Sequence, residues 1–301
     1  MSAMRREDGL VSAILIFLDG ERFIEEAIES VFAQTYPRWE LILADDGSSD
    51  GSTAIARRWA DAHPDRVRYV EHPGHRNLGM SATRNLALRH ARGAYVGFID
   101  ADDVWLPEKL ARQVALLEAH PEVGMIYPPT AYWYGWTGDP ADEALDEVAP
   151  LGVPPETVVH PPTMLLRFLQ EIAKPPPTSG ALMRRATVDR VGGYVESFRT
   201  MYEDQAFFAK MVLAAPVFAT ATYSSRYRQH PRSACARADA AGVWQQAEDV
   251  YLRWLAHHLA GYRFRFGPEW TALRRLLQPY RRRVTDRLLA RARRLVGQRR
   301  A

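Results

Sequence analysis

The chain has 301 residues, 47% of them hydrophobic, and a formal net charge of +3. That length suffices for one large core or two small ones. No run of 18 apolar residues occurs and no apolar stretch follows the start, so we expect neither a membrane span nor a signal peptide. Cys235 is the single cysteine, which excludes an internal disulfide framework and suits the cytoplasm.

Positive charge is concentrated at the C-terminal end. Residues 271–301 hold eleven arginines against one acid, Asp286, so the rest of the chain carries a net charge of −7. No lysine or arginine occurs between Arg112 and Arg167. Because a nucleic-acid enzyme spreads positive charge along its substrate channel, this distribution argues against nucleic acid as a partner.

Apolar runs alternate with amphipathic segments along the first 127 residues. We predict strands at 11–17, 39–44, 67–70, 95–99 and 123–127, with helices at 21–34, from the turn at 45–50 through Trp59, at 81–92 and at 107–119. Such alternation indicates an α/β fold with a mainly parallel sheet. Sheets of this kind bind ligands beyond the carboxyl ends of their strands.

The strand at 95–99 ends in three acids, Asp100, Asp102 and Asp103. Three carboxylates within four residues repel one another unless a cation offsets them. A hard divalent ion bound together with substrate phosphates is the favoured interpretation. The alternative is an acidic turn that caps the helix beginning near Pro107.

A second acidic pair, Asp45 and Asp46, ends the strand at 39–44. Since the carboxyl ends of parallel strands meet at one edge of a sheet, both acidic clusters can share one crevice. For this pair, a turn followed by a helix cap is the alternative.

After Tyr127 the alternation stops. Residues 128–162 are rich in proline, acids and aromatic side chains, which suggests a long surface excursion whose Trp and Tyr cluster at 132–136 packs rather than binds sugar. We predict a strand at 178–183, a turn at 191–194, a helix at 204–213 and helical structure from 244 onward.

Short motifs follow one another in order over residues 10–235. After the opening strand they are Ala33-Gln34-Thr35-Tyr36, the run from Glu40 to Asp50, Arg76-Asn77-Leu78-Gly79, Ala82-Thr83-Arg84-Asn85, the run from Phe98 to Trp105, Val191-Gly192-Gly193-Tyr194 and Tyr202-Glu203-Asp204. In this order and spacing they resemble the family 2 glycosyltransferases, an inverting group with the GT-A fold.

The resemblance implies a GT-A domain over 1–235, Rossmann-like with flanking helices, and an acceptor side at about 128–235. A helical, basic extension would follow at 236–301. The implied reaction moves a sugar from a nucleotide-sugar donor, with a UDP-sugar favoured, to an acceptor hydroxyl with inversion. The implied cofactor is a divalent cation, Mn²⁺ or Mg²⁺, and the implied role is in polysaccharide, glycolipid or other cell-surface glycan synthesis.

The same resemblance assigns roles to individual residues. Asp102, with Asp100 nearby, would hold the metal on the donor diphosphate, and Asp204 would be the catalytic base. The residues that would bind the nucleotide sugar are Phe17, Asp19, Asp45, Asp46, Asn77, Gly79, Arg84, Asp100, Ala101, Asp102 and His230. The family usually ends its first strand in a pair such as Tyr-Asn, whereas this chain reads Phe17-Leu18-Asp19, so part of the nucleoside pocket is undetermined.

Several of these residues also have structural interpretations. Asp204 could be an N-cap for the helix that follows it. Arg84 and Asn85 could be solvated helix residues rather than diphosphate contacts. A single histidine such as His230 is more often structural than a ligand of metal or phosphate.

Two other functions fit part of the pattern. An apolar strand followed by Asp100-Ala101-Asp102-Asp103-Val104 also fits a phosphatase of the haloacid dehalogenase type, with Asp100 as nucleophile and Asp102 as acid. That class places its motif on the earliest strand, whereas three strand units come first here. The other alternative is a non-catalytic nucleotide-sugar-binding protein.

The arginine-rich end surrounds an apolar stripe, made of Leu273, Leu276, Leu277, Tyr280, Val284 and Leu288. Three interpretations compete: a solvated helix packed on the body, contact with the acidic body of a second subunit, and peripheral attachment to anionic lipid at the inner face of the membrane.

Overall fold

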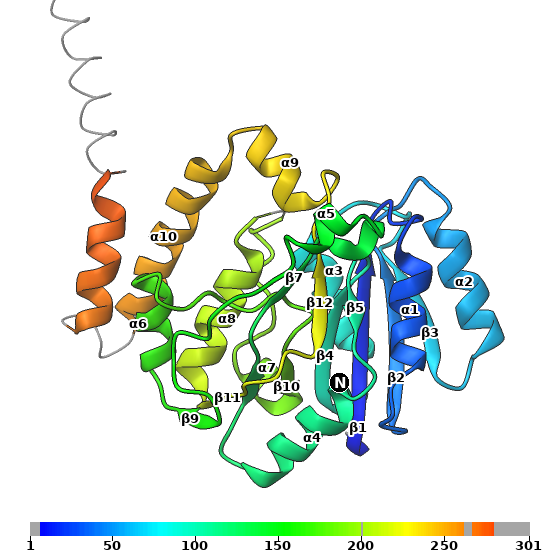
Figure 1. The fold of residues 1–301 in the computed structure, drawn as a ribbon, viewed down its shortest axis with the longest axis horizontal. Coiled ribbons are helices and arrows are strands. Elements are labelled where there is room, and N and C mark those ends of the chain that lie inside the picture. The colour runs from blue at the N-terminus through cyan, green and yellow to red at the C-terminus, as the bar shows by residue number, and fades with distance from the viewer. Residues whose placement is uncertain (1–6, 200, 262–266, 280–301) are drawn as a thin grey trace, which may run out of the picture.

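The computed structural model describes residues 7–199, 201–261 and 267–279 (Figure 1). Strands and helices alternate through the first 127 residues, as expected. They are β1 (Glu7–Phe17), α1 (Ile24–Phe32), β2 (Trp39–Asp45), α2 (Ser52–Ala62), β3 (Val67–Glu71), α3 (Met80–His90), β4 (Gly93–Asp100), β5 (Val104–Trp105), α4 (Lys109–Ala119) and β6 (Met125–Tyr127). The predicted helices therefore lie within a few residues of the observed ones.

One eight-stranded sheet crosses the molecule in the order β3-β2-β1-β4-β10-β6-β11-β9, where β9 is Thr157–Val159, β10 is Leu182–Arg184 and β11 is Val217–Ala219. Strands β1 to β4 are parallel to one another, as are β6 and β11, whereas β10 and β9 run antiparallel to the strands beside them. Phe17 pairs with Asp45 and Ile16 with Asp100, so both acidic clusters end at one edge of the sheet.

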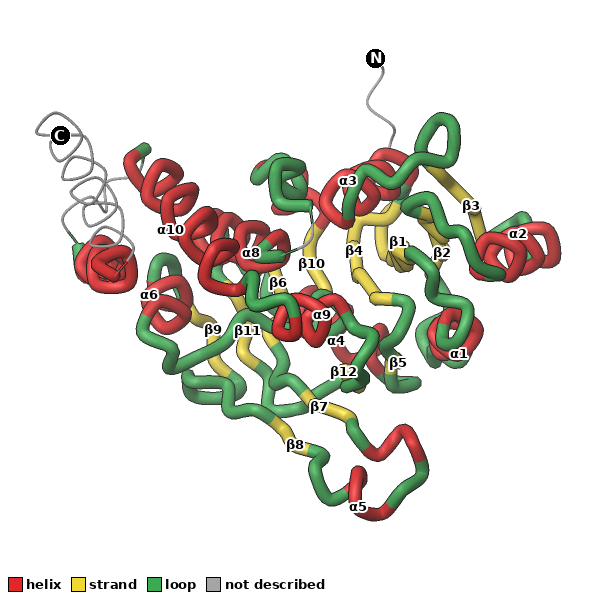
Figure 2. Tube along the Cα trace, turned by 90° about the horizontal axis from the view of Figure 1, so that it is seen from above, coloured by secondary structure: helices red, strands yellow, loops and turns green. Residues whose placement is uncertain are grey.

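Helices cover both faces of this sheet (Figure 2). Alternate residues of β1 enter different cores: Ala13 and Leu15 pack with α1 and α4, whereas Ile14 and Ile16 pack on the face that carries α3 and α8 (Glu203–Ala214). A strand buried on both faces reads as a continuous apolar run, which explains why β1 shows no polar alternation.

The stretch 128–162 holds more regular structure than the expected excursion. It contributes β7 (Ala131–Trp133) and β8 (Glu147–Val148) to a second sheet of order β5-β12-β7-β8, with the short helix α5 (Pro140–Glu143) between them. The partner strand β12 (Ser225–Arg228) comes about ninety residues after β7 in the chain, so local sequence pattern could not reveal this pairing.

The predicted strand at 178–183 begins only at Leu182. Its first residues have another role, because the Thr178 and Ser179 hydroxyls bond to Asp100 and Asp103. The turn at 191–194 is confirmed by Gly192 and Gly193, both in the left-handed region.

Beyond α6 (Thr163–Leu169), α7 (Arg185–Arg190) and α8, the chain continues as α9 (Ala234–Ala240), α10 (Trp244–Ala260) and helical residues 268–279. Leu273 and Leu277 are buried in the core, so the first part of the apolar stripe packs on the body. The basic residues after 279, on which the membrane and second-subunit alternatives depend, lie outside the described residues. No helix within the described ranges is long and apolar enough to cross a bilayer.

Candidate active site

A cavity of about 1450 Å³ opens at the carboxyl ends of β1, β2 and β4. Of the twelve predicted site residues, eleven line it: Phe17, Asp19, Asp46, Asn77, Gly79, Arg84, Asp100, Ala101, Asp102, Asp204 and His230. Asp45 does not. Residues of α9 and α10, from Ala238 to Leu252, also line the cavity, so it extends past the boundary predicted at 235.

Asp46 organises one wall of this cavity. Its Oδ1 accepts hydrogen bonds from the backbone N–H groups of Leu78 (2.8 Å) and Gly79 (3.0 Å) and lies 2.9 Å from the Thr83 hydroxyl. Gly79 has a φ of +94°, and a Cβ there would lie 3.0 Å from Arg199. Only glycine allows this approach without strain, so the loop closes tightly over Asp46.

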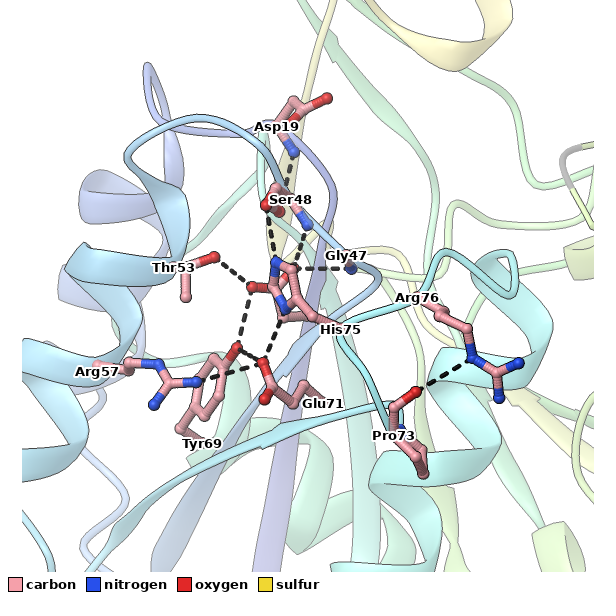
Figure 3. A network of polar contacts seen from close by, with 11 residues as sticks. Asp19, Gly47, Ser48, Thr53, Arg57, Tyr69, Glu71, Pro73, His75 and Arg76 are labelled. Atoms are coloured by element: carbon pink, nitrogen blue, oxygen red, sulfur yellow. Dashed lines mark hydrogen bonds and ion pairs between the residues drawn. The ribbon is translucent and has the colours of Figure 1, made fainter.

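Asp45 does not line the cavity and is instead hydrogen-bonded to Gly47 and Thr53, which lie in the polar network of Figure 3. It is completely buried, its oxygens accept hydrogen bonds from the backbone of Gly47 and Ser48 and from the hydroxyl of Thr53, and the Tyr69 hydroxyl lies 3.1 Å from its Oδ2. Because both of its oxygens are engaged, Asp45 has none available for a ligand and instead stabilises the turn that follows β2.

Glu71 and His75 extend this network. Together with Asp45 they are close enough to hold a metal ion, with ligand atoms within 4.8 Å of one another. Their atoms are already engaged, however: His75 bridges the Glu71 carboxylate and the Ser48 carbonyl, each at 2.8 Å, and Tyr69 donates to Glu71. None of the three lines the cavity, so the trio fixes the loop after β3 rather than the reaction centre.

The three acids after β4 have three different environments. Asp100 accepts hydrogen bonds from Arg84 and Thr178, both at 2.7 Å. Asp103 is buried, where Ser179 and the backbone N–H of Arg228 donate to it. Burial, then the charges of the other two acids, raise the pKa of Asp103 well above its ordinary value.

Asp102 is the acid of this cluster that is available to bind a ligand. Its side chain is 29% exposed, and its Oδ2 lies 2.9 Å from Nε2 of His230, which packs against Phe23 at 4.9 Å between ring centres. A carboxylate oxygen beside an imidazole nitrogen is a donor set that suits Mn²⁺ and related divalent cations. His230 therefore has a place beside the expected metal ligand.

Arg84 links the two acidic sides of the cavity. Its side chain is 2% exposed, and its Nη1 and Nη2 donate to Glu203 (3.0 Å) and Asp100 (2.7 Å). The interpretation of Arg84 as a solvated helix residue is therefore wrong. Asn85 is likewise engaged, with Tyr194 and Glu196.

Asp204 is the second residue of α8, so it is not the N-cap, a position that Tyr202 occupies. Its Oδ1 accepts from the backbone N–H of Gln205 at 2.7 Å. Burial raises its pKa, although the Gln205 hydrogen bond opposes the shift. Burial, then the Asp204 charge, raise the pKa of Glu203 to about 7 against the effect of Arg84. A carboxyl with a raised pKa facing a cavity has the properties of a general base.

Sequence reasoning missed some residues of the site. Glu203 was part of a recognised motif, but nothing in its pattern showed that it would pair with a buried arginine. Thr178 follows a proline triplet that gives no sign of the hydrogen bond to Asp100. Tyr251 lines the cavity from a segment without a recognised motif, and Tyr202, although part of the Tyr202-Glu203-Asp204 motif, was given no role of its own.

The chain is similar to proteins of one known family. The Glycosyl transferase family 2 profile matches residues 12–192. The UDP-Glc:α-D-GlcNAc-diphosphoundecaprenol β-1,3-glucosyltransferase WfgD of Escherichia coli is 34% identical over 111 residues, 37% of this chain and 42% of that protein. The matches to this and the two other leading curated relatives span between 39% and 52% of those proteins.

Solved structures show the same fold at low sequence identity. TarS of S. aureus in complex with UDP-GlcNAc has a TM-score of 0.60 and 21% identity, covering 89% of this chain and 81% of that one. The mannosyltransferase PcManGT from Pyrobaculum calidifontis, in complex with GDP-Man and Mn²⁺, has a TM-score of 0.59 and 21% identity, covering 95% and 79%. With its GT-A architecture and its family profile over residues 12–192, the chain belongs to glycosyltransferase family 2.

Proposed function

We propose that the protein transfers a sugar from a nucleotide-sugar donor to an acceptor hydroxyl, with inversion, in the synthesis of a cell-surface glycan. The observation that carries this proposal is that one cavity gathers the Asp46 wall, the Asp102–His230 pair and Asp204. A uridine nucleotide is the favoured donor, since WfgD is named for UDP-Glc and TarS was solved with UDP-GlcNAc.

In this proposal the cavity residues have separate roles in the reaction. Asp102 and His230 would hold a divalent cation, which when bound stabilises negative charge on the departing diphosphate. Asp204 removes the proton from the acceptor hydroxyl as that oxygen attacks the anomeric carbon from the face opposite the diphosphate. Arg84 holds Glu203 and Asp100 in place on either side of it.

The two alternatives lose support. Family membership and the position of Asp100 on the fourth strand disfavour the phosphatase. Asp100 also has both oxygens bonded, to Arg84 and Thr178, which leaves it poorly placed as a nucleophile. The presence of Asp204 in the same cavity as the Asp102–His230 pair favours catalysis over binding alone.

Replacing Asp102 tests this function. Asp102→Ala should fold normally, because it relieves repulsion with Asp100 and Asp103, and should lose the part of donor turnover that depends on Mn²⁺. The measurement is release of nucleoside diphosphate from a panel of nucleotide sugars, with Mn²⁺ titrated from zero. Near-normal Mn²⁺-dependent turnover in the variant would show that the metal assignment is wrong.

Turnover should also depend on pH through Glu203 and Asp204. Both pKa values are raised, that of Glu203 to about 7, and a base acts only when it is unprotonated. Because the proposed base is Asp204, whose pKa is raised by burial, we expect kcat to fall with decreasing pH at a midpoint above about 4, the value of an exposed aspartate. Removing the neighbouring carboxylate with Glu203→Gln should shift the midpoint to lower pH. A profile that stays flat down to about pH 4 would contradict this.

A further inference from the structure

Tyr202 has an unusual backbone conformation directly before the Glu203–Asp204 pair. Its φ of +61° and ψ of +11° place it in the left-handed region. For a residue with a bulky side chain this conformation is strained, and it persists only where the surroundings impose it. Such strain is concentrated at functional sites, so the contacts that impose it are informative.

Helix α10 supplies those contacts. The Tyr202 ring stacks on Tyr251, with ring centres 5.1 Å apart and planes at 20°, and meets the edge of Trp244 at 6.0 Å. Tyr251 is buried, and burial, followed by the charge of Asp204, raises the pKa of its hydroxyl. The helix therefore reaches both the strained residue and the neighbourhood of the carboxylate.

The same helix also holds the segment that precedes Tyr202. Trp254, three residues after Tyr251 and thus on the same helix face, packs against the edge of Phe198 at 5.6 Å. Next to Phe198, Arg199 donates to the carbonyl oxygen of Asn77 at 3.1 Å on the nucleotide side of the cavity. One face of α10 thus contacts the chain at both Phe198 and Tyr202.

We infer that α10 belongs to the catalytic unit: Tyr251 and Trp244 hold Tyr202 in its left-handed conformation and so fix the direction of the Asp204 carboxylate. Tyr202 is then a positioning residue. The inference rests on the proposed function and extends it, because α10 lies beyond both the family-matched residues 12–192 and the predicted catalytic boundary at 235. Figure 1 shows α10 beside α8, the helix that carries Asp204.

Tyr202→Gly separates positioning from stability. Glycine adopts the left-handed conformation without strain, so the backbone remains acceptable while the aromatic contacts are lost. We expect kcat for donor turnover to fall about tenfold or more, because small misplacements of a catalytic group are costly. Donor KM and nucleotide affinity should change little. Tyr202→Phe keeps the ring, so the kcat of this variant should lie within about twofold of wild type.

Tyr251→Leu is the partner variant, with Tyr251→Phe as its matched control. If both tyrosines act through one contact, the double variant Tyr202→Gly/Tyr251→Leu should lose no more kcat than the worse single variant. A Tyr202→Gly enzyme with wild-type kcat, or losses of kcat that multiply in the double variant, would overturn the inference.

Asp204→Asn distinguishes failure of this inference from failure of the proposed function. If Asp204→Asn abolishes turnover while Tyr202→Gly leaves it intact, only the role of α10 is wrong. If Asp204→Asn itself turns over normally, the proposed base is wrong, whatever Tyr202 does.

Discussion

Asp204→Asn is expected to turn over donor at least about 10²-fold more slowly than wild type, because an amide cannot accept the acceptor proton. The exchange preserves side-chain shape, and the amide oxygen can still accept from the Gln205 N–H. Nucleotide affinity and thermal midpoint should stay close to wild type, since removing a partly buried charge does not disturb packing. Single-turnover assays with saturating donor would measure the loss.

The same substitution at an exposed position is the control for this variant. Asp61 lies exposed on α2, so Asp61→Asn should leave every parameter unchanged. If Asp204→Asn lost nucleotide binding together with turnover, its carboxylate would be supporting the site structurally rather than acting as the base.

Arg84→Met is expected to lower the free energy of unfolding by about 3–5 kcal/mol, the usual result of removing one partner from a buried ion pair. The substitution leaves Asp100 and Glu203 without their shared cation in a place where Arg84 itself is 2% exposed. Without Arg84, which lowers the pKa of Glu203, the raised pKa of that carboxyl would rise further in the folded state, so the loss should grow as the pH rises through that pKa. Urea unfolding at about pH 5 and pH 8 would show this trend.

Two further variants, one compensating and one a control, are compared with Arg84→Met. Arg84→Met/Glu203→Gln removes one of the abandoned carboxylates and should recover part of the stability. Arg58→Met breaks an exposed ion pair with Glu25, 63% and 40% exposed, and should change the free energy of unfolding by less than about 1 kcal/mol. A loss for Arg84→Met no larger than for Arg58→Met would show that the buried pairs are not stabilising.

The alternation of apolar runs and helices predicted the parallel half of the sheet, because strands buried on both faces leave an unmistakable pattern. Strand order and register then bring Asp46 and Asp102 to one cavity, as the motifs implied. Asp45 shows the limit of that reasoning. Adjacent residues can point in opposite directions. Only the fold shows that the Asp45 carboxylate is hydrogen-bonded within the turn after β2, while Asp46 lines the cavity.

Long-range partners were the other limit. The pairing of β12 with β7, the contact between Arg84 and Glu203 and the stacking of Tyr251 on Tyr202 each join segments at least 49 residues apart in the chain. No local pattern of hydrophobicity or capping carries information about such contacts. They decide which of the motif residues are buried, bonded or left open to a ligand.

Isothermal titration calorimetry of the full chain with UDP and with GDP, each with and without Mn²⁺, tests most directly whether the cavity binds a nucleotide-sugar donor. We predict that UDP binds, that Mn²⁺ tightens its binding, and that Asp102→Ala removes the tightening without removing all affinity. If neither nucleotide bound under either condition, the assignment of this cavity to a nucleotide sugar would be contradicted.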